Sequence, residues 1–123
     1  MAEKILVVDD SKLVTDIVKM RLSMYGYDVR AHEHGTAGLE WLASHDADVV
    51  FVDLIMPDMT GLELTKKIRA LPSKAKLPIV LLSANTDRKI TQSAPEEQPD
   101  RILQKPWDLK QLLETLAEIT SPK

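Results

Sequence analysis

Acidic, hydroxyl and ammonium side chains occur directly after short apolar segments of this chain. They are Asp9, Asp10, Asp53, Ser83 and Lys105. Carboxylate oxygens without histidine or thiolate partners suit a hard cation such as Mg²⁺, which proteins usually hold with one or two carboxylates and phosphate oxygens. A carboxylate can also act as a nucleophile, and phosphoryl transfer depends mainly on positioning and charge neutralisation. If these side chains lie together, they favour phosphoryl transfer assisted by a hard cation.

Each of these residues also has an ordinary structural alternative. An aspartate after a strand commonly caps the next helix, so Asp9 or Asp10 could be a cap. Ser83 could begin a turn, and Lys105 could be a solvated surface charge. The functional interpretation therefore depends on whether the fold brings all of these residues to one place.

Short apolar segments alternate with amphipathic segments along the whole chain. The expected strands are residues 5–8, 27–31, 49–52, 78–82 and 101–104. Ser11 and Thr36 are the expected N-caps of the first two helices. Apolar residues at helical spacing mark the first helix at Leu13, Ile17, Met20 and Met24, and a leucine-rich stripe from Leu109 to Ile119 marks the last one.

This alternation predicts an α/β fold, because parallel strands need crossover connections that cover both faces of their sheet. Five strands in this length favour a flavodoxin-like three-layer sandwich with the strand order 2-1-3-4-5. Ligands of such sheets bind at the carboxyl ends of the strands, where the strand order reverses. The first and third strands are then neighbours, so Asp9, Asp10 and Asp53 should converge.

Length and composition bound the class of protein. With 123 residues, the chain suits a single domain over residues 1–123. Cysteine is absent, which excludes disulfides, thiolate metal sites and catalytic thiols, and it favours a reducing compartment. The net charge of −3 gives no sign of nucleic-acid or lipid binding, and no signal peptide or membrane span is evident. We therefore expect a cytoplasmic protein.

The motifs at the strand ends resemble the receiver domain of response regulators, a CheY-like family. The resemblance is carried in order by Val7-Val8-Asp9-Asp10, by Asp53 with Met56-Pro57 and Gly61, by Ser83-Ala84, and by Lys105-Pro106. It extends from about Lys4 to Ile119, nearly the whole chain.

The resemblance implies a role for each matching residue. Asp53 would be the phosphoacceptor, Lys105 would pair with a phosphoryl oxygen, and Ser83 would move to hydrogen-bond the phosphoryl group. Asp10, Asp53 and the backbone carbonyl of Ile55 would bind Mg²⁺ directly, and Asp9 would act mainly through a metal-bound water. The phosphoryl donor would be a histidine kinase or a histidine phosphotransfer protein. A separate output protein or a fused output domain would respond, with no nucleic acid or membrane bound by this domain. Beyond catalysing its own phosphorylation and dephosphorylation, the chain would not be an enzyme.

Three features depart from the family pattern. Ile102 stands where the family usually has a tyrosine or phenylalanine that moves together with the serine. Pro95 and Pro99 predict a short or irregular fourth helix that ends near Ser93. Ile55 and Asn85 occupy two variable positions that tune the lifetime of the phosphorylated state, and the apolar Ile55 predicts slow self-dephosphorylation.

Two other function classes compete with a phosphorylated receiver. A degenerate receiver that only binds partners would not need the full set of strand-end residues, although Ile102 and the unusual fourth helix keep this alternative open. A haloacid-dehalogenase-type phosphatase would need an aspartate at Ile55, and a flavodoxin would need a phosphate loop in place of residues 9–12. Both of these enzyme classes are therefore disfavoured.

Overall fold

The computed structural model describes residues 3–83, 95, 98–104 and 107–120. Its strands are β1 (Lys4–Val8), β2 (Asp28–His32), β3 (Val49–Asp53), β4 (Ile79–Ser83) and β5 (Arg101–Gln104). Its helices are α1 (Lys12–Ser23), α2 (Gly35–Ser44), α3 (Gly61–Arg69) and α5 (Leu109–Thr120). The predicted fourth helix falls mostly on residues 84–94, outside the described residues. Among the helices that are described, none has the length and apolarity needed to cross a membrane.

The five strands form one parallel sheet in the order β2-β1-β3-β4-β5, which confirms the flavodoxin-like prediction. In its register, Val8 of β1 pairs with Val52 of β3, and Asp53 of β3 pairs with Leu82 of β4. The carboxyl ends of the three central strands are therefore level with one another.

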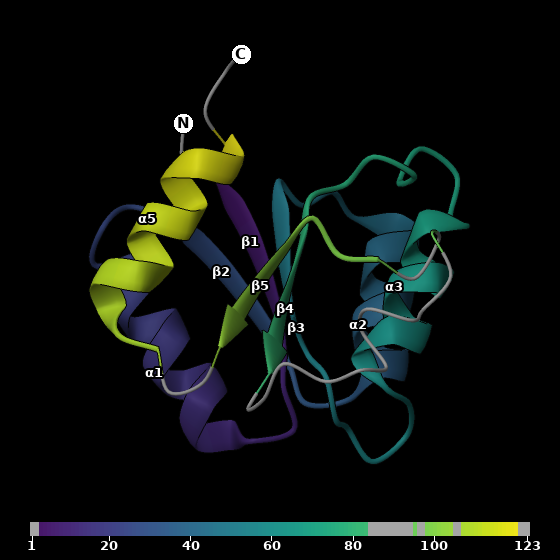
Figure 1. The fold of residues 1–123 in the computed structure, drawn as a ribbon, viewed down its shortest axis with the longest axis horizontal. Helices are drawn as coiled ribbons and strands as arrows, with labels where there is room; N and C mark the ends of the chain where they lie inside the picture. Colours follow the sequence, from purple (N-terminus) through teal and green to yellow (C-terminus); the bar gives the residue numbers. More distant parts are fainter. Residues whose placement is uncertain (1–2, 84–94, 96–97, 105–106, 121–123) are drawn as a thin grey trace.

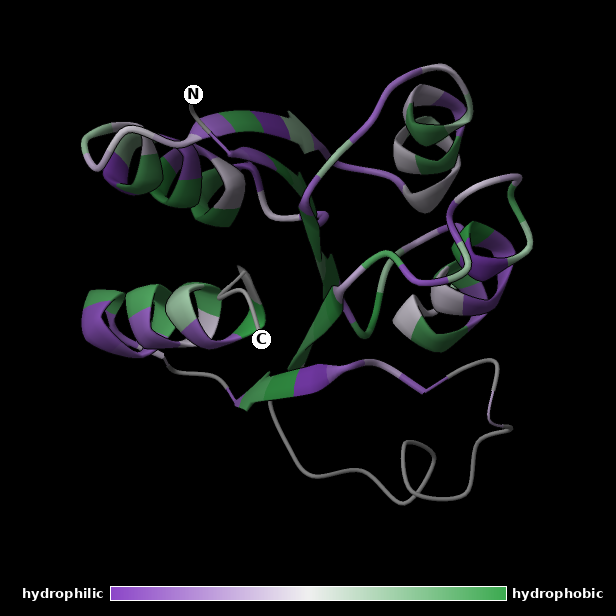
Figure 2. Ribbon diagram, turned by 90° about the horizontal axis from the view of Figure 1, so that it is seen from above, coloured by the Kyte–Doolittle hydropathy of each residue, from purple (hydrophilic) through white to green (hydrophobic). Residues whose placement is uncertain are grey.

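The sheet separates two apolar layers, because helices cover both of its faces. Helices α1 and α5 lie on one face, and α2 and α3 lie on the other (Figures 1 and 2). Successive residues of β3 alternate between the layers: Val50 and Val52 face α2 and α3, whereas Val49 and Phe51 face α1 and α5. A strand buried on both faces must be apolar throughout, which is why periodicity of two is absent from its sequence.

The N-caps of two helices follow from local sequence. The Ser11 hydroxyl accepts a hydrogen bond from the backbone N–H of Val14 (3.3 Å), as predicted, and the Thr60 hydroxyl accepts one from Glu63 at the start of α3 (3.1 Å). Such caps satisfy backbone donors that a helix leaves free in its first turn. They fix where α1 and α3 begin, after the two strands that lead to the candidate aspartates.

The prediction that Thr36 caps the second helix is wrong. Helix α2 begins at Gly35, and His34 occupies the N-cap position without a side-chain hydrogen bond to the helix. Thr36 lies in the first turn instead, where its backbone N–H and its hydroxyl both donate to Asp58. A carboxylate from a distant segment thus serves as the cap, so no local signal marks the true start of the helix.

Helix α1 is apolar on two opposite faces. The residues that it buries are Thr15, Val18 and Leu22. The predicted apolar stripe is real but points to solvent, since Leu13 is 70% exposed and Met24 is 77% exposed. Spacing alone identified the helix but not the side that packs on the sheet.

Candidate functional site

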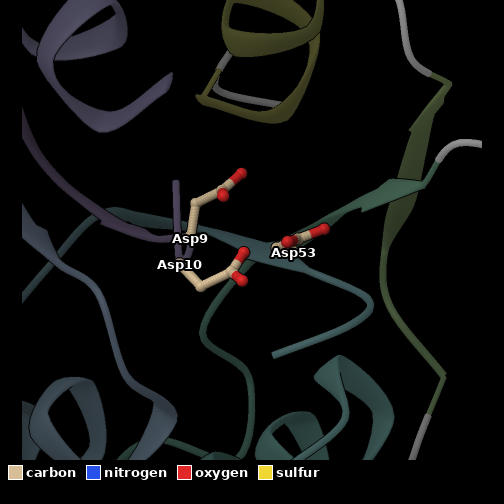
Figure 3. Close-up of side chains that lie close together, drawn as sticks. All are labelled: Asp9, Asp10 and Asp53. Atoms are coloured by element: carbon tan, nitrogen blue, oxygen red, sulfur yellow. The ribbon is translucent and has the colours of Figure 1, made fainter. Parts of the chain in front are cut away.

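Three carboxylates meet at the carboxyl ends of β1 and β3. Asp9 and Asp10 directly follow β1, and Asp53 is the last residue of β3. One oxygen from each side chain can be chosen so that all three atoms lie within 4.8 Å of one another. Figure 3 shows the three side chains gathered in this small space. The predicted convergence of the acidic residues is therefore confirmed.

Asp9 is fixed within this cluster by its surroundings. Its side chain is completely buried, and Oδ1 accepts a hydrogen bond from the backbone N–H of Ser11 (2.9 Å). Its own backbone N–H donates to the carbonyl of His32 at the end of β2 (3.1 Å). Asp10, by contrast, is exposed. The cluster thus has one carboxylate inside the protein and one open to water.

Asp53 and Ser83 are the last residues of two adjacent strands. Both are buried, with 8% of Asp53 and 2% of Ser83 exposed to solvent. The structure places the predicted hydroxyl at the end of the neighbouring strand, one residue beyond Leu82, the register partner of the predicted nucleophile. Lys105 lies outside the described residues, so its place in the site stays a prediction.

Gly61 allows the chain to turn closely around Asp53. A Cβ at this position would lie 2.6 Å from the backbone oxygen of Asp53 and 3.0 Å from Cα of Leu54. The first distance is shorter than real Cβ contacts and the second is tighter than most of them, so only glycine fits without movement of the backbone. The N–H of Gly61 also donates to the Leu54 carbonyl at 2.7 Å, which closes the loop between β3 and α3.

The loop between β3 and α3 carries Ile55, whose backbone carbonyl is a predicted metal ligand. Ile55 forms an isolated antiparallel bridge with Thr60, and its side chain is 73% exposed. The side chain therefore contributes little packing, and the backbone at this position is held by the loop itself. Ile102, at the usual place of a mobile aromatic residue, lies on β5 and is 46% exposed.

Asp58 in the same loop was not identified from the sequence. Its carboxylate accepts hydrogen bonds from the N–H of Gly35 (3.1 Å), the N–H of Thr36 (2.9 Å) and the hydroxyl of Thr36 (2.6 Å). These bonds favour the ionised form, and the Thr36 hydroxyl contributes most to lowering the pKa of Asp58 to about 2. Asp58 is therefore ionised at neutral pH, and its charge faces the N-terminus of α2, where an anion is stabilising.

The donor set of the cluster fits a hard cation. All three side chains offer carboxylate oxygens, and two of them are buried where mutual repulsion is costly without a counter-charge. Mg²⁺ prefers oxygen ligands and usually retains waters and phosphate oxygens, which an open position beside Asp10 permits. The donor set of the site therefore suits a divalent cation beside the carboxylate of Asp53.

Comparison with known families agrees with this geometry. Residues 5–117 match the model of the response regulator receiver domain. The chain belongs to this family. Its members are receiver domains of two-component systems, so the resemblance carried by the strand-end motifs is confirmed.

Individual relatives support the assignment of this chain to the receiver-domain family. It is 32% identical over 109 residues to the DNA-binding transcriptional regulator NtrC of Rhizobium meliloti. That match covers 89% of this chain but only 22% of NtrC. The chemotaxis response regulator CheY4 of Vibrio cholerae superposes with a TM-score of 0.89 at 30% identity, over 97% of this chain and 99% of CheY4.

A third relative is similar in fold alone. The receiver domain of the sensor histidine kinase PA1611 of Pseudomonas aeruginosa has a TM-score of 0.90 at 22% identity. The match covers 99% of this receiver domain and 100% of that one. The structure of the PA1611 domain has a magnesium ion coordinated in its active site cleft.

Proposed function

We propose that this receiver domain accepts a phosphoryl group on Asp53 in two-component signal transduction. The single observation that carries the proposal is the carboxylate cluster. One carboxylate oxygen of Asp53 lies within 4.8 Å of an oxygen of Asp9 and an oxygen of Asp10. A histidine kinase or a histidine phosphotransfer protein would be the donor. Residues 1–123 would act as one cytoplasmic domain, coupled to a separate output protein or to a fused output domain.

The cation of the site would be Mg²⁺, as in the PA1611 domain. Asp10, Asp53 and the carbonyl of Ile55 would bind it directly, with Asp9 acting through water. A bound Mg²⁺ supplies positive charge beside the phosphoryl oxygens. The buried Asp9 side chain, held by the N–H of Ser11, keeps a carboxylate oxygen at a fixed position beside this site.

The transfer step needs no other reactant than the phosphoryl donor. A carboxylate oxygen of Asp53 attacks phosphorus, an O–P bond forms, and the bond from phosphorus to the donor breaks with its electron pair on the leaving group. Lys105 would pair with an equatorial phosphoryl oxygen. The hydroxyl of Ser83, on the adjacent strand end, would donate a hydrogen bond to another one.

Intact-mass measurement with a small phosphodonor tests this proposal. With acetyl phosphate and Mg²⁺, the parent should gain one phosphoryl group, and Asp53→Asn should gain none. Asp48→Asn is a matched control, because Asp48 is an exposed aspartate just before β3 rather than at its end. Absence of an adduct on the folded parent, with every donor tried, would indicate a receiver that only binds partners.

The lifetime of the adduct should depend on Ile55. Its exposed side chain has no polar group to orient a water molecule for attack on the phosphoryl group. Ile55→Asn adds such a group and should shorten the half-life about tenfold, less than the roughly 100-fold that a positioned general base contributes. Loss of the phosphoryl group over time by intact mass is the measurement, and an unchanged half-life would contradict the prediction.

A further inference from the structure

Helix α2 is capped by a residue from the loop between β3 and α3. The first turn of α2 has no side-chain cap of its own, since His34 makes no such bond. Asp58 supplies the missing acceptor over a separation of 22 residues, with both carboxylate oxygens in use. The N-terminus of α2 and the loop between β3 and α3 are thus joined by three hydrogen bonds.

A close apolar fit supports the same junction. A Cβ at Gly35 would lie 2.7 Å from Cγ and 2.8 Å from Sδ of Met59, the residue after Asp58. Met59 itself packs against the apolar layer under α2 and α3. The loop is therefore held to the start of α2 by packing as well as by charge.

The start of α2 is in turn connected to the first strand. His32 ends β2 three residues before Gly35, and its carbonyl accepts the backbone N–H of Asp9 (3.1 Å). A continuous path therefore runs from Asp53 through the β3–α3 loop to Asp58, across to α2, and back along His32 to Asp9.

We infer that Asp58 is a positioning residue for the carboxylate site, acting by holding the β3–α3 loop at a fixed distance from the Asp9 end of β1. The inference rests on the proposed function for its consequence, namely that cation binding depends on this distance. Asp9 and the carbonyl of Ile55 stand on opposite sides of the junction, so loosening it separates two groups that would share one ion. Loss of an outer-shell partner that holds a metal ligand typically changes metal affinity by about 10- to 100-fold, and the lower end is expected for this less direct contact.

The test uses Asp58→Ala, with Asp48→Ala as its matched control. Asp48 is also an exposed aspartate, and it accepts a hydrogen bond from the backbone N–H of Lys4 at 2.6 Å. It directly precedes β3, however, and so lies at the amino ends of the strands, away from the cluster. The first measurement is hydrogen exchange of the Asp9 and Gly38 amides without metal. The Gly38 amide donates to His34 and reports on the first turn of α2, whereas the Asp9 amide reports on the far end of the path.

In Asp58→Ala, both amides should exchange at least about fivefold faster, and Asp48→Ala should leave them unchanged. Faster exchange at Gly38 alone would reduce Asp58 to a local cap and overturn the inference. The second measurement is Mg²⁺ affinity by titration calorimetry, which should fall about tenfold in Asp58→Ala and less than twofold in Asp48→Ala. Unchanged affinity in Asp58→Ala would also overturn the inference.

Variants of Thr36 separate positioning from simple loss of stability. Thr36→Ala removes the 2.6 Å hydroxyl bond to Asp58, whereas Thr36→Ser retains it. Mg²⁺ affinity should fall in the alanine variant and recover in the serine variant, and equal affinities in the two would contradict the inference. If the parent binds no Mg²⁺ at all, the proposed function fails, and the exchange of the Asp9 amide alone then decides the role of Asp58.

Discussion

Asp10→Asn is expected to make the metal-free protein more stable than the parent and to remove most of its Mg²⁺ affinity. Two unit charges at the 4.8 Å limit of this cluster repel by about 1 kcal/mol in water and by about 3 kcal/mol at a dielectric constant of 20. Because Asp10 is exposed, the lower figure applies, and the free energy of unfolding without metal should rise by about 1 kcal/mol.

In the presence of Mg²⁺, the parent should instead be more stable than Asp10→Asn. Loss of Asp10 as a proposed direct ligand should weaken binding by about 100-fold, the upper end of the range known for outer-shell partners. At a Mg²⁺ concentration 100 times its Kd, the parent gains about 2.7 kcal/mol of stability, and the variant gains less than about 0.5 kcal/mol. Urea unfolding of the parent and of Asp10→Asn, each with and without Mg²⁺, measures this reversal of relative stability.

Asp28→Asn is the control for these measurements, since Asp28 is an exposed aspartate at the start of β2, away from the cluster. Mg²⁺ should not change its stability relative to that of the parent. If Asp10→Asn were less stable than the parent at every Mg²⁺ concentration, repulsion within the cluster would not be a feature of the metal-free protein.

Gly61→Ala is expected to destabilise the protein by about 3 kcal/mol, at the upper end of the usual cost of overpacking. The added methyl group would meet the backbone of Asp53 and of Leu54, which cannot move aside as the end of a side chain can. Relief requires a shift of the turn that carries Asp53, so the yield of phosphoryl adduct should fall as well.

Gly26→Ala provides the comparison, because nothing lies within 4 Å of its added Cβ and its only cost is a φ of +90°. Such a conformation costs about 1 kcal/mol for an alanine. Thermal or urea unfolding of the two variants measures the difference. Equal destabilisation by both would show that the turn around Asp53 accommodates a side chain.

Much of the fold was predictable, because its strands are buried on both faces and therefore stand out as short apolar segments. The predicted strand at residues 101–104 has the observed bounds of β5. The predicted strand at residues 49–52 ends one residue before the observed end of β3 at Asp53. The parallel sheet then fixes which ends are neighbours, so the convergence of Asp9, Asp10 and Asp53 followed from topology.

The junction at Asp58 was not predictable in the same way. Local spacing made Thr36 the natural cap of α2, but the true acceptor comes from a segment 22 residues further along the chain. A cap of this kind depends on how α2 and the loop before α3 pack together, and that packing has no periodic signature in the sequence. The burial of Val18 rather than Ile17 on α1 is a second outcome decided by packing.

The two apolar faces of α1 have a consequence for how the chain reaches its native state. Turning this helix by about half a revolution around its axis would present Leu13, Met20 and Met24 to the sheet in place of Val18 and Leu22. Hydrophobicity alone does not reject that arrangement, so it is a compact competitor on the folding landscape. The choice between them falls to shape, because short branched Val18 fits beside the strands where a long methionine would overpack. Folding of this domain therefore depends on side-chain shape in α1 as well as on its hydrophobic pattern.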